Sequence, residues 1–246
     1  MKLAIMQPYF FPFIGYFQAI NAVDKYILYE NLDYIKEGWM SRNRVLIKNK
    51  TPSYFSPILE GRSSNKKIYE IELNTNFNWR RKLLNKVFFN YKGSSFFDES
   101  YNLIEECINI EGDILFMYNS QIIYKIAEHL EINTEIQYDN KHYLPLEQKL
   151  AEGIIQNTQY EKKLMRVFEI CKQEKANVFV NAIGGRKLYD KKRFKEDGID
   201  LFFVETEEIV YKQFSDDFHP NLSIIDVLMH NGREKTKELL KNYKLI

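Results

Sequence analysis

The stretch MKLAIMQPYFFPFIGYFQAI, residues 1–20, predicts the start of an α/β fold. Its residues 3–6 have the apolar character of a strand, and residues 17–20 begin a helix-like pattern. Between them, Pro8 and Pro12 stiffen the turn, and Gly15 allows backbone or ligand to approach closely. In open α/β sheets, ligands bind just beyond the carboxyl end of a strand. The turn is therefore a candidate binding element, although its aromatic residues could instead simply fill a core.

The composition permits an enzyme and argues against non-specific DNA binding. The 246 residues can form one large α/β domain, and 35 Lys and Arg against 34 Asp and Glu leave a net charge of only +1. Cys107 and Cys171 have no metal-ligand partners at suitable spacing, which indicates buried thiols in a reducing compartment and argues against zinc. No signal peptide and no apolar run of about 18 residues is visible. We therefore expect a cytoplasmic protein without membrane insertion.

The pattern along the chain predicts a Rossmann-like parallel-sheet α/β core with a largely helical middle section, at about residues 78–175. We expect strands at 25–29, 45–47, 54–58, 68–73, 177–181 and 201–205. We expect helices at 79–90, 97–106, 115–130, 162–175, 223–229 and 234–243. Because no linker interrupts this series, residues 1–246 are expected to form a single domain.

Two basic segments could bind an anion. Trp39, Arg42, Asn43 and Arg44 combine a flat ring, an amide and two guanidinium groups, which suits a phosphate or carboxylate, although a solvated basic edge is the alternative. The second segment is a turn that follows a predicted strand and contains Gly184, Gly185, Lys187 and Tyr189. Its glycines could present backbone N–H groups to an anion, although an ordinary strand-to-helix turn remains the alternative.

The candidates for acid–base catalysis are Glu30 and Asp190. Each follows a predicted strand, where a carboxylate held in a cleft can acquire a pKa suited to proton transfer. Asp190 could equally cap a helix. The four histidines are scattered without a metal-binding or triad spacing, so no metal site is expected.

The motifs MQPYFFPFIGYFQAI, GWMSRNRVLI, NAIGGRKLYDKKRFKEDGIDLFF and YKQFSDDFHPNLSIIDVLMHNG occur in this order over nearly the whole chain. In this respect the sequence resembles the WbqC-like family of bacteria. The chain departs from the family pattern at Glu30 and Asn31, where a pair of aspartates is expected. The matching positions are Gln7, Pro8, Tyr9, Pro12, Gly15, Tyr16, Trp39, Arg42, Asn43, Arg44, Gly184, Gly185, Tyr189, Gln213 and Asp226.

The resemblance implies a role in bacterial surface-polysaccharide biosynthesis, in O-antigen or capsule. We expect acyl or aminoacyl transfer to a nucleotide-linked amino sugar, with Glu30 or Asp190 as base. The donor is left open among a thioester, an activated amino acid and a charged tRNA, with no tightly bound cofactor expected and a homo-oligomer left open. The expected substrate-binding residues are Gln7, Tyr9, Gly15, Tyr16, Trp39, Arg42, Asn43, Arg44, Gly184, Gly185, Lys187 and Tyr189.

Two alternatives differ in class. One is a non-catalytic protein of the same pathway that binds nucleotide sugars. The other is an ATP-using ligase or nucleotidyltransferase, because Phe13-x-Gly15-Tyr16 lies where the HxGH element of such enzymes lies, with aromatic residues in place of both histidines.

Overall fold

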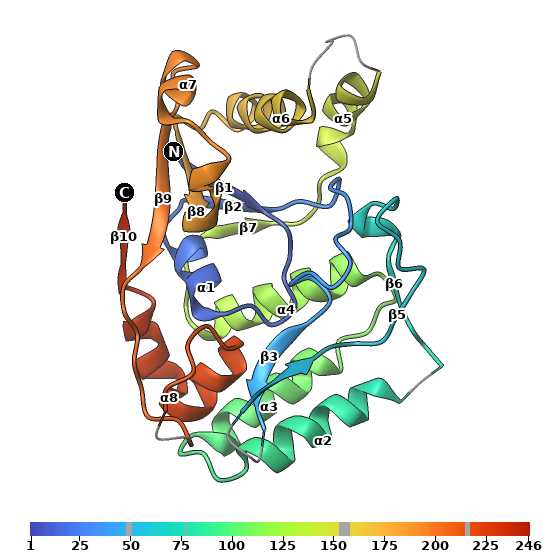
Figure 1. The fold of residues 1–246 in the computed structure, drawn as a ribbon, viewed down its shortest axis with the longest axis vertical. Coiled ribbons are helices and arrows are strands. Elements are labelled where there is room, and N and C mark those ends of the chain that lie inside the picture. Colours follow the sequence, from blue (N-terminus) through green and yellow to red (C-terminus); the bar gives the residue numbers. More distant parts are fainter. Residues whose placement is uncertain (48–50, 77, 153–157, 215–216) are drawn as a thin grey trace.

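A six-stranded sheet forms the centre of the computed structural model, which describes residues 1–246 apart from 48–50, 77, 153–157 and 215–216 (Figure 1). The strand order is β10-β9-β8-β1-β2-β7, and all pairs are parallel except β9 with β10. The strands of this sheet are β1 (Lys2–Met6), β2 (Lys25–Leu28), β7 (Glu135–Gln137), β8 (Val178–Ala182), β9 (Asp200–Thr206) and β10 (Tyr243–Leu245). The described helices are α1 (Ile14–Asn21), α2 (Trp79–Tyr91), α3 (Phe97–Ile108), α4 (Leu115–His129), α5 (Leu144–Ala151), α6 (Gln159–Gln173), α7 (Lys191–Glu196) and α8 (Ile224–Leu239).

The direction of the chain through the sheet reverses at β1. From β1 it passes to β2 and then β7 on one side, whereas β8 returns to the other side of β1 and is followed by β9. The connections that leave the carboxyl ends of β1 and β8 therefore diverge. Such a switch point is where open α/β sheets place their ligands. The expected Rossmann-like α/β core is confirmed.

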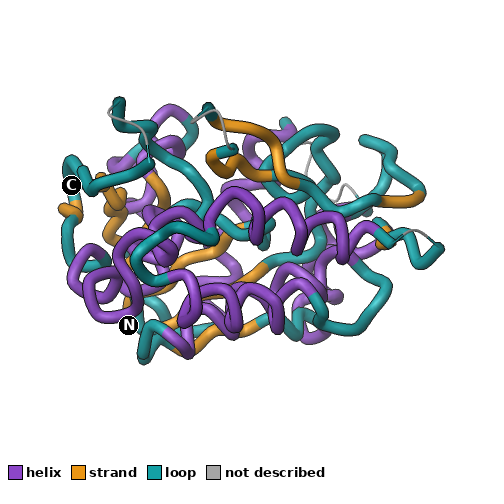
Figure 2. Tube along the Cα trace, turned by 90° about the horizontal axis from the view of Figure 1, so that it is seen from below, coloured by secondary structure: helices purple, strands orange, loops and turns teal. Residues whose placement is uncertain are grey.

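Helices cover both faces of the sheet. Alternate residues of a strand point to opposite faces, so Ala4 and Tyr26 pack against α1, α4 and α8, whereas Leu3, Ile27 and Phe179 pack against α5, α6 and α7. Figure 1 shows the second group of helices above the sheet. Figure 2, seen from below, shows the helices that cover the opposite face. The sheet core is therefore buried on both sides, as parallel strands require.

Two small hairpins lie outside the central sheet. They pair β3 (Asn43–Leu46) with β4 (Pro52–Phe55), and β5 (Leu59–Glu60) with β6 (Glu72–Leu73). The strand predicted at 68–73 is wrong in its first half, since Ile68–Glu70 forms a 3-10 turn. The last helix ends at Leu239 rather than at residue 243, and β10 follows it.

The turn after β1 is a rigid part of the core. Phe10 and Phe11 are fully buried, and Phe11 adopts a positive φ of 40°, which is rare for a bulky residue. Hydrogen bonds from other parts of the chain fix the carbonyl oxygens of this turn. The Tyr16 hydroxyl donates to the Gln7 carbonyl, and Asn119 Nδ2 donates to that of Pro8. Asn43 Nδ2 donates to the Phe10 and Phe11 carbonyls, Ser223 Oγ also donates to that of Phe11, and the Ile224 N–H donates to that of Pro12. These aromatic residues therefore fill the core, and the turn holds Gln7 in a fixed position.

Within the part of the chain that the structure describes, no helix combines the length and the apolar character needed to cross a membrane.

Candidate functional site

A pocket of about 670 Å³ lies at the switch point, beneath α5 and α6. This volume falls in the range of small-molecule sites. The wall combines apolar, aromatic, amide and charged side chains: Ile5, Gln7, Tyr29, Asn31, Leu32, Asp33, Ile35, Lys67, Tyr69, Leu144, Glu147, Gln148, Leu150, Ala151, Lys162, Lys163, Arg166, Val167, Phe179 and Tyr189. Most of these residues follow or belong to β1, β2 and β8, or come from the helices that cover their carboxyl ends, whereas Lys67 and Tyr69 come from the segment between β5 and β6.

The α6 wall of the pocket is basic. Lys162 and Arg166 are four residues apart and so share one helix face, with Lys163 beside them. Arg166 donates to both carboxylate oxygens of Glu147, at 2.5 and 2.8 Å, and the Tyr29 hydroxyl donates to the same carboxylate at 2.7 Å. Burial lowers the pKa of Arg166, but these contacts with Glu147 raise it by more. Arg166 and Glu147 therefore neutralise each other.

A second ion pair lies on the opposite rim, where Lys67 Nζ is 2.7 Å from Asp33 Oδ1. The pocket thus has four cationic side chains against two carboxylates, and both carboxylates are paired. Lys162 and Lys163 have no ion-pair partner among the described residues. The pocket therefore carries a surplus of about two positive charges and can attract an anion.

Two amide side chains lie near the carboxyl ends of neighbouring strands. Gln7 directly follows β1, and Asn31 follows β2. Asn31 is only 6% exposed, and its Nδ2 has no hydrogen-bond partner among the residues described. The pocket therefore offers neutral hydrogen-bonding groups as well as charge.

Of the site residues predicted from sequence, Gln7 and Tyr189 line this pocket. The Tyr189 ring contacts the rings of Phe179 and Phe194 edge to face, at 6.0 and 5.5 Å between centroids. These contacts hold Tyr189 beside the carboxyl end of β8.

The two predicted catalytic carboxylates do not line the pocket. Glu30 is half-buried, and its pKa is raised by burial and by the nearby Asp139. Asp190 is exposed and caps α7, with Oδ1 accepting the Arg193 N–H at 2.9 Å. The structure thus gives Asp190 the capping contact that was its alternative interpretation.

Gly15, Tyr9 and Tyr16 pack inside the protein. A Cβ on Gly15 would lie 2.3 Å from the Phe13 ring and 2.8 Å from Thr206 Oγ1, so the close approach there is made by protein atoms. The ring of Tyr16 is buried against Tyr9, with centroids 5.3 Å apart. Burial raises the pKa of both tyrosines.

The basic segment around Trp39 lies at the β3–β4 hairpin and does not contribute to the pocket. The Arg42 guanidinium stacks 4.2 Å from the Tyr54 ring centre, and that of Arg44 lies 5.9 Å from Trp39. Asn43 is buried and holds the carbonyls of the first turn. The structure therefore separates this segment from the switch point.

The glycine turn after β8 forms a short 3-10 helix, Ile183–Lys187, outside the pocket lining. A Cβ on Gly184 would meet no described atom within 4 Å, whereas one on Gly185 would lie 2.4 Å from Asn181 Nδ2. Lys187 is exposed. Gly185 therefore serves packing, and Gly184 faces open space.

The matching positions Gln213 and Asp226 belong to a buried polar cluster elsewhere. The fully buried Asp226 carboxylate accepts hydrogen bonds from the Tyr91 and Tyr211 hydroxyls and from Gln213 Nε2, at 2.9, 2.7 and 2.8 Å. Because three donors satisfy this carboxylate, the cluster joins α2, α8 and the segment before α8 as a structural element.

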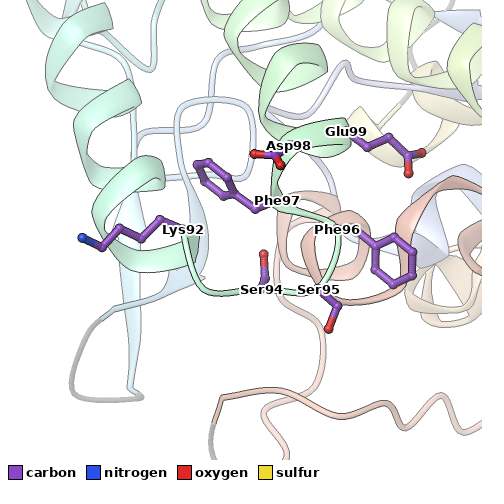
Figure 3. Close-up of a pocket in the computed structure, with 7 residues that line it drawn as sticks. All are labelled: Lys92, Ser94, Ser95, Phe96, Phe97, Asp98 and Glu99. Atoms are coloured by element: carbon purple, nitrogen blue, oxygen red, sulfur yellow. The ribbon is translucent and has the colours of Figure 1, made fainter.

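A second hollow, of about 350 Å³, lies where α2 turns into α3 (Figure 3). All of its lining residues belong to one continuous segment, residues 92–99. It brings together no groups from distant parts of the chain. Among the described residues there is also no group of His, Cys, Asp and Glu side chains that could hold a metal ion.

Four residues of the pocket were not predicted as site residues from the sequence: Asn31, Lys162, Lys163 and Arg166. Helix 162–175 was predicted, and the basic residues at its start were visible. What the pattern did not contain was the packing of this helix over the ends of β1, β2 and β8.

The fold and the pocket define an α/β protein with a basic pocket at the switch point of its sheet. The chain matches the WbqC-like protein family over residues 7–238 and belongs to that family, which confirms the resemblance of its motifs. It is 26% identical over 235 residues to a protein of Mycobacterium tuberculosis (strain ATCC 25618 / H37Rv) named "Uncharacterized protein Rv1507c", with 95% of each chain covered. No solved structure matches the chain.

Proposed function

We propose that the protein binds a nucleotide-linked amino sugar in the switch-point pocket and transfers an acyl or aminoacyl group to it, in bacterial surface-polysaccharide biosynthesis. The single observation that carries this proposal is the pair of uncompensated cations, Lys162 and Lys163, on the wall of a pocket that also offers aromatic and amide groups. The lysines can bind a phosphate, the aromatic side chains can pack against a flat base, and the amide groups can form hydrogen bonds with a neutral sugar.

The charge of the pocket favours a nucleotide sugar over ATP. Each diester phosphate carries about one negative charge, so the diphosphate of a nucleotide sugar carries about two. A terminal monoester phosphate carries about 1.5 to 2 by itself, so ATP carries nearly four. Since Lys162 and Lys163 supply the surplus of about two positive charges, they match the diphosphate diester.

Acyl transfer to an amine requires the neutral amine, and a carboxylate can remove its proton. We propose Glu30 as the base: it does not itself line the pocket, but it directly precedes the lining residue Asn31, and burial and the nearby Asp139 raise its pKa. The proposed donor is a thioester, an activated amino acid or a charged tRNA. As the amide bond to the sugar forms, the acyl bond of the donor breaks and releases the thiol, the activating group or the tRNA.

A second candidate is a non-catalytic protein that binds nucleotide sugars. It is favoured by the pairing of both pocket carboxylates, Asp33 with Lys67 and Glu147 with Arg166. In this arrangement neither carboxylate is free to act as a base.

Calorimetric titration with UDP- and dTDP-linked sugars tests binding, with ATP and Mg²⁺ as a separate arm. The double variant Lys162→Gln/Lys163→Gln should lower the affinity for the nucleotide sugar by about tenfold or more. The matched control is Lys172→Gln/Lys192→Gln, which removes the same charge from exposed positions and should bind normally. If the wild-type protein binds no nucleotide sugar, or if both double variants bind equally well, the proposal is wrong.

Mass spectrometry of the sugar after incubation with each class of donor separates the two candidates. An added acyl or aminoacyl mass supports the transferase. Tight binding without any product from the three donor classes supports the binding protein.

A further inference from the structure

Asn31 is an exception among the buried amides of this protein. Asn43, Asn119 and Asn140 each donate through Nδ2 to two backbone carbonyls, at 2.7 to 3.2 Å. Gln18 does the same through Nε2. Asn31 is also buried, at 6% exposed, and lines the pocket, but its Nδ2 has no partner among the described residues. A buried donor without a partner is unfavourable, and in a pocket wall a bound ligand can supply the missing acceptor.

The unpaired amide can reach the pocket. The Nδ2 atom is shielded from solvent in the structure, but the terminal torsion of an asparagine side chain is soft, so the amide can turn toward a ligand at little cost. The backbone nearby is fixed, because the Tyr29 N–H bonds the Met6 carbonyl and the Tyr16 hydroxyl bonds the Gln7 carbonyl. Only the side chain of Asn31 therefore needs to move.

We expect the acceptor for this donor to be uncharged. At this end of the pocket Asp33 is paired with Lys67, so no uncompensated cation is left there to bind an anion. The unpaired cations that suit an anion, Lys162 and Lys163, come from α6 instead. Gln7, at the end of the neighbouring strand, adds a second neutral hydrogen-bonding group.

We propose that Asn31 determines ligand specificity by donating a hydrogen bond to a neutral carbonyl or hydroxyl oxygen of the ligand, while the lysines of α6 bind its phosphates. This inference rests on the proposed function and assigns an orientation within the same pocket. The acceptor is an oxygen of either the base or the sugar.

Calorimetric titrations of the wild type, Asn31→Leu and the control Asn102→Leu test this assignment. Asn102 undergoes the same substitution, but it is exposed on α3 and lies outside the pocket lining. The probes are UDP-N-acetylglucosamine and dTDP-glucose, then UDP and dTDP, and finally pyrophosphate, which has neither base nor sugar. Asn31→Leu should weaken binding of the nucleotide sugars about tenfold or more, with unchanged affinity for pyrophosphate. Asn102→Leu should bind all probes normally.

The nucleoside diphosphates distinguish the two sources. If Asn31→Leu weakens binding of UDP and dTDP as much as binding of the nucleotide sugars, the acceptor lies on the base. If Asn31→Leu binds UDP and dTDP as the wild type does, the acceptor lies on the sugar. The inference is overturned if Asn31→Leu binds every probe normally, or if pyrophosphate binding falls by the same factor. If the wild type binds none of the nucleotide probes, the proposed function fails and this inference fails with it.

A stability measurement guards against misfolding. Because Nδ2 has no partner to lose, Asn31→Leu should unfold at a temperature no lower than the wild type. Asn31→Asp, which keeps the size and replaces the donor with a charge, should weaken nucleotide-sugar binding at least as much. Normal binding by Asn31→Asp contradicts the assignment even if Asn31→Leu does not fold.

Discussion

Removing the hydroxyl of Tyr91 should destabilise the protein strongly. This hydroxyl donates to the fully buried Asp226 carboxylate at 2.9 Å and accepts the Leu46 N–H at 2.9 Å. Tyr91→Phe keeps the ring and its packing but breaks both bonds. It therefore weakens the support of a buried charge and leaves a strand N–H without its partner.

The magnitude follows from these two bonds. A hydrogen bond to a charged group contributes about 1.5 to 3 kcal/mol, and an unsatisfied buried N–H costs roughly 1 to 3 kcal/mol. Tyr91→Phe should therefore lower the free energy of unfolding by roughly 2.5 to 6 kcal/mol. For a chain of this size, that corresponds to a decrease in Tm of about 5 to 24 °C.

Urea unfolding and calorimetry on three variants check this reasoning. Tyr211→Phe breaks one charged bond and should cost about 1.5 to 3 kcal/mol. Tyr118→Phe, the control, loses a neutral bond to the Ile108 carbonyl and should cost about 0.5 to 1.5 kcal/mol. An equal loss of stability in Tyr118→Phe and Tyr91→Phe would contradict the expected contribution of the bonds to Asp226 and Leu46. Because the cluster is structural, Tyr211→Phe should keep the nucleotide-sugar affinity of the wild type.

Two further predictions concern pH and glycine packing. Burial lowers the pKa of His230 below its ordinary 6.5, and the nearby Asp226 offsets this only in part. As the pH falls, the unfolded chain therefore takes up the proton on His230 before the folded protein does, and the free energy of unfolding should fall from pH 7 to pH 5. This fall should be smaller in His230→Phe. If urea unfolding gives the same pH dependence for this variant and the wild type, the prediction is wrong. Gly185→Ala should lower Tm, because its Cβ would collide with Asn181, whereas Gly184→Ala has open space and should unfold within a degree or two of the wild type. A thermal melt of both variants checks this, and equal losses would refute it.

The parallel core could be predicted because each of its main strands is a run of consecutive apolar residues in the sequence. Residues 3–6, 25–29, 177–181 and 201–205 correspond to β1, β2, β8 and β9. The edge strands β7 and β10 have three residues each, too few for a periodic pattern to be recognised. Their pairing is decided by tertiary contact with β2 and β9.

The site could be predicted only where it depends on the ends of strands. Gln7 and Tyr189 follow β1 and β8, so the topology rule alone places them near the switch-point pocket. Lys162 and Lys163 reach the pocket because α6 packs across the sheet, which periodicity does not reveal. Gly15 shows the opposite case, since its need for a close approach was predicted, but the approaching groups are Phe13 and Thr206.

A crystal structure of the protein with the nucleotide sugar that binds best would locate the ligand directly. We expect the diphosphate to lie against Lys162 and Lys163 on α6, with a neutral oxygen of the ligand within hydrogen-bond distance of Asn31. A ligand bound instead between Trp39 and Arg44, at the start of β3, would contradict the proposed site, because the switch-point pocket would then have no role in binding.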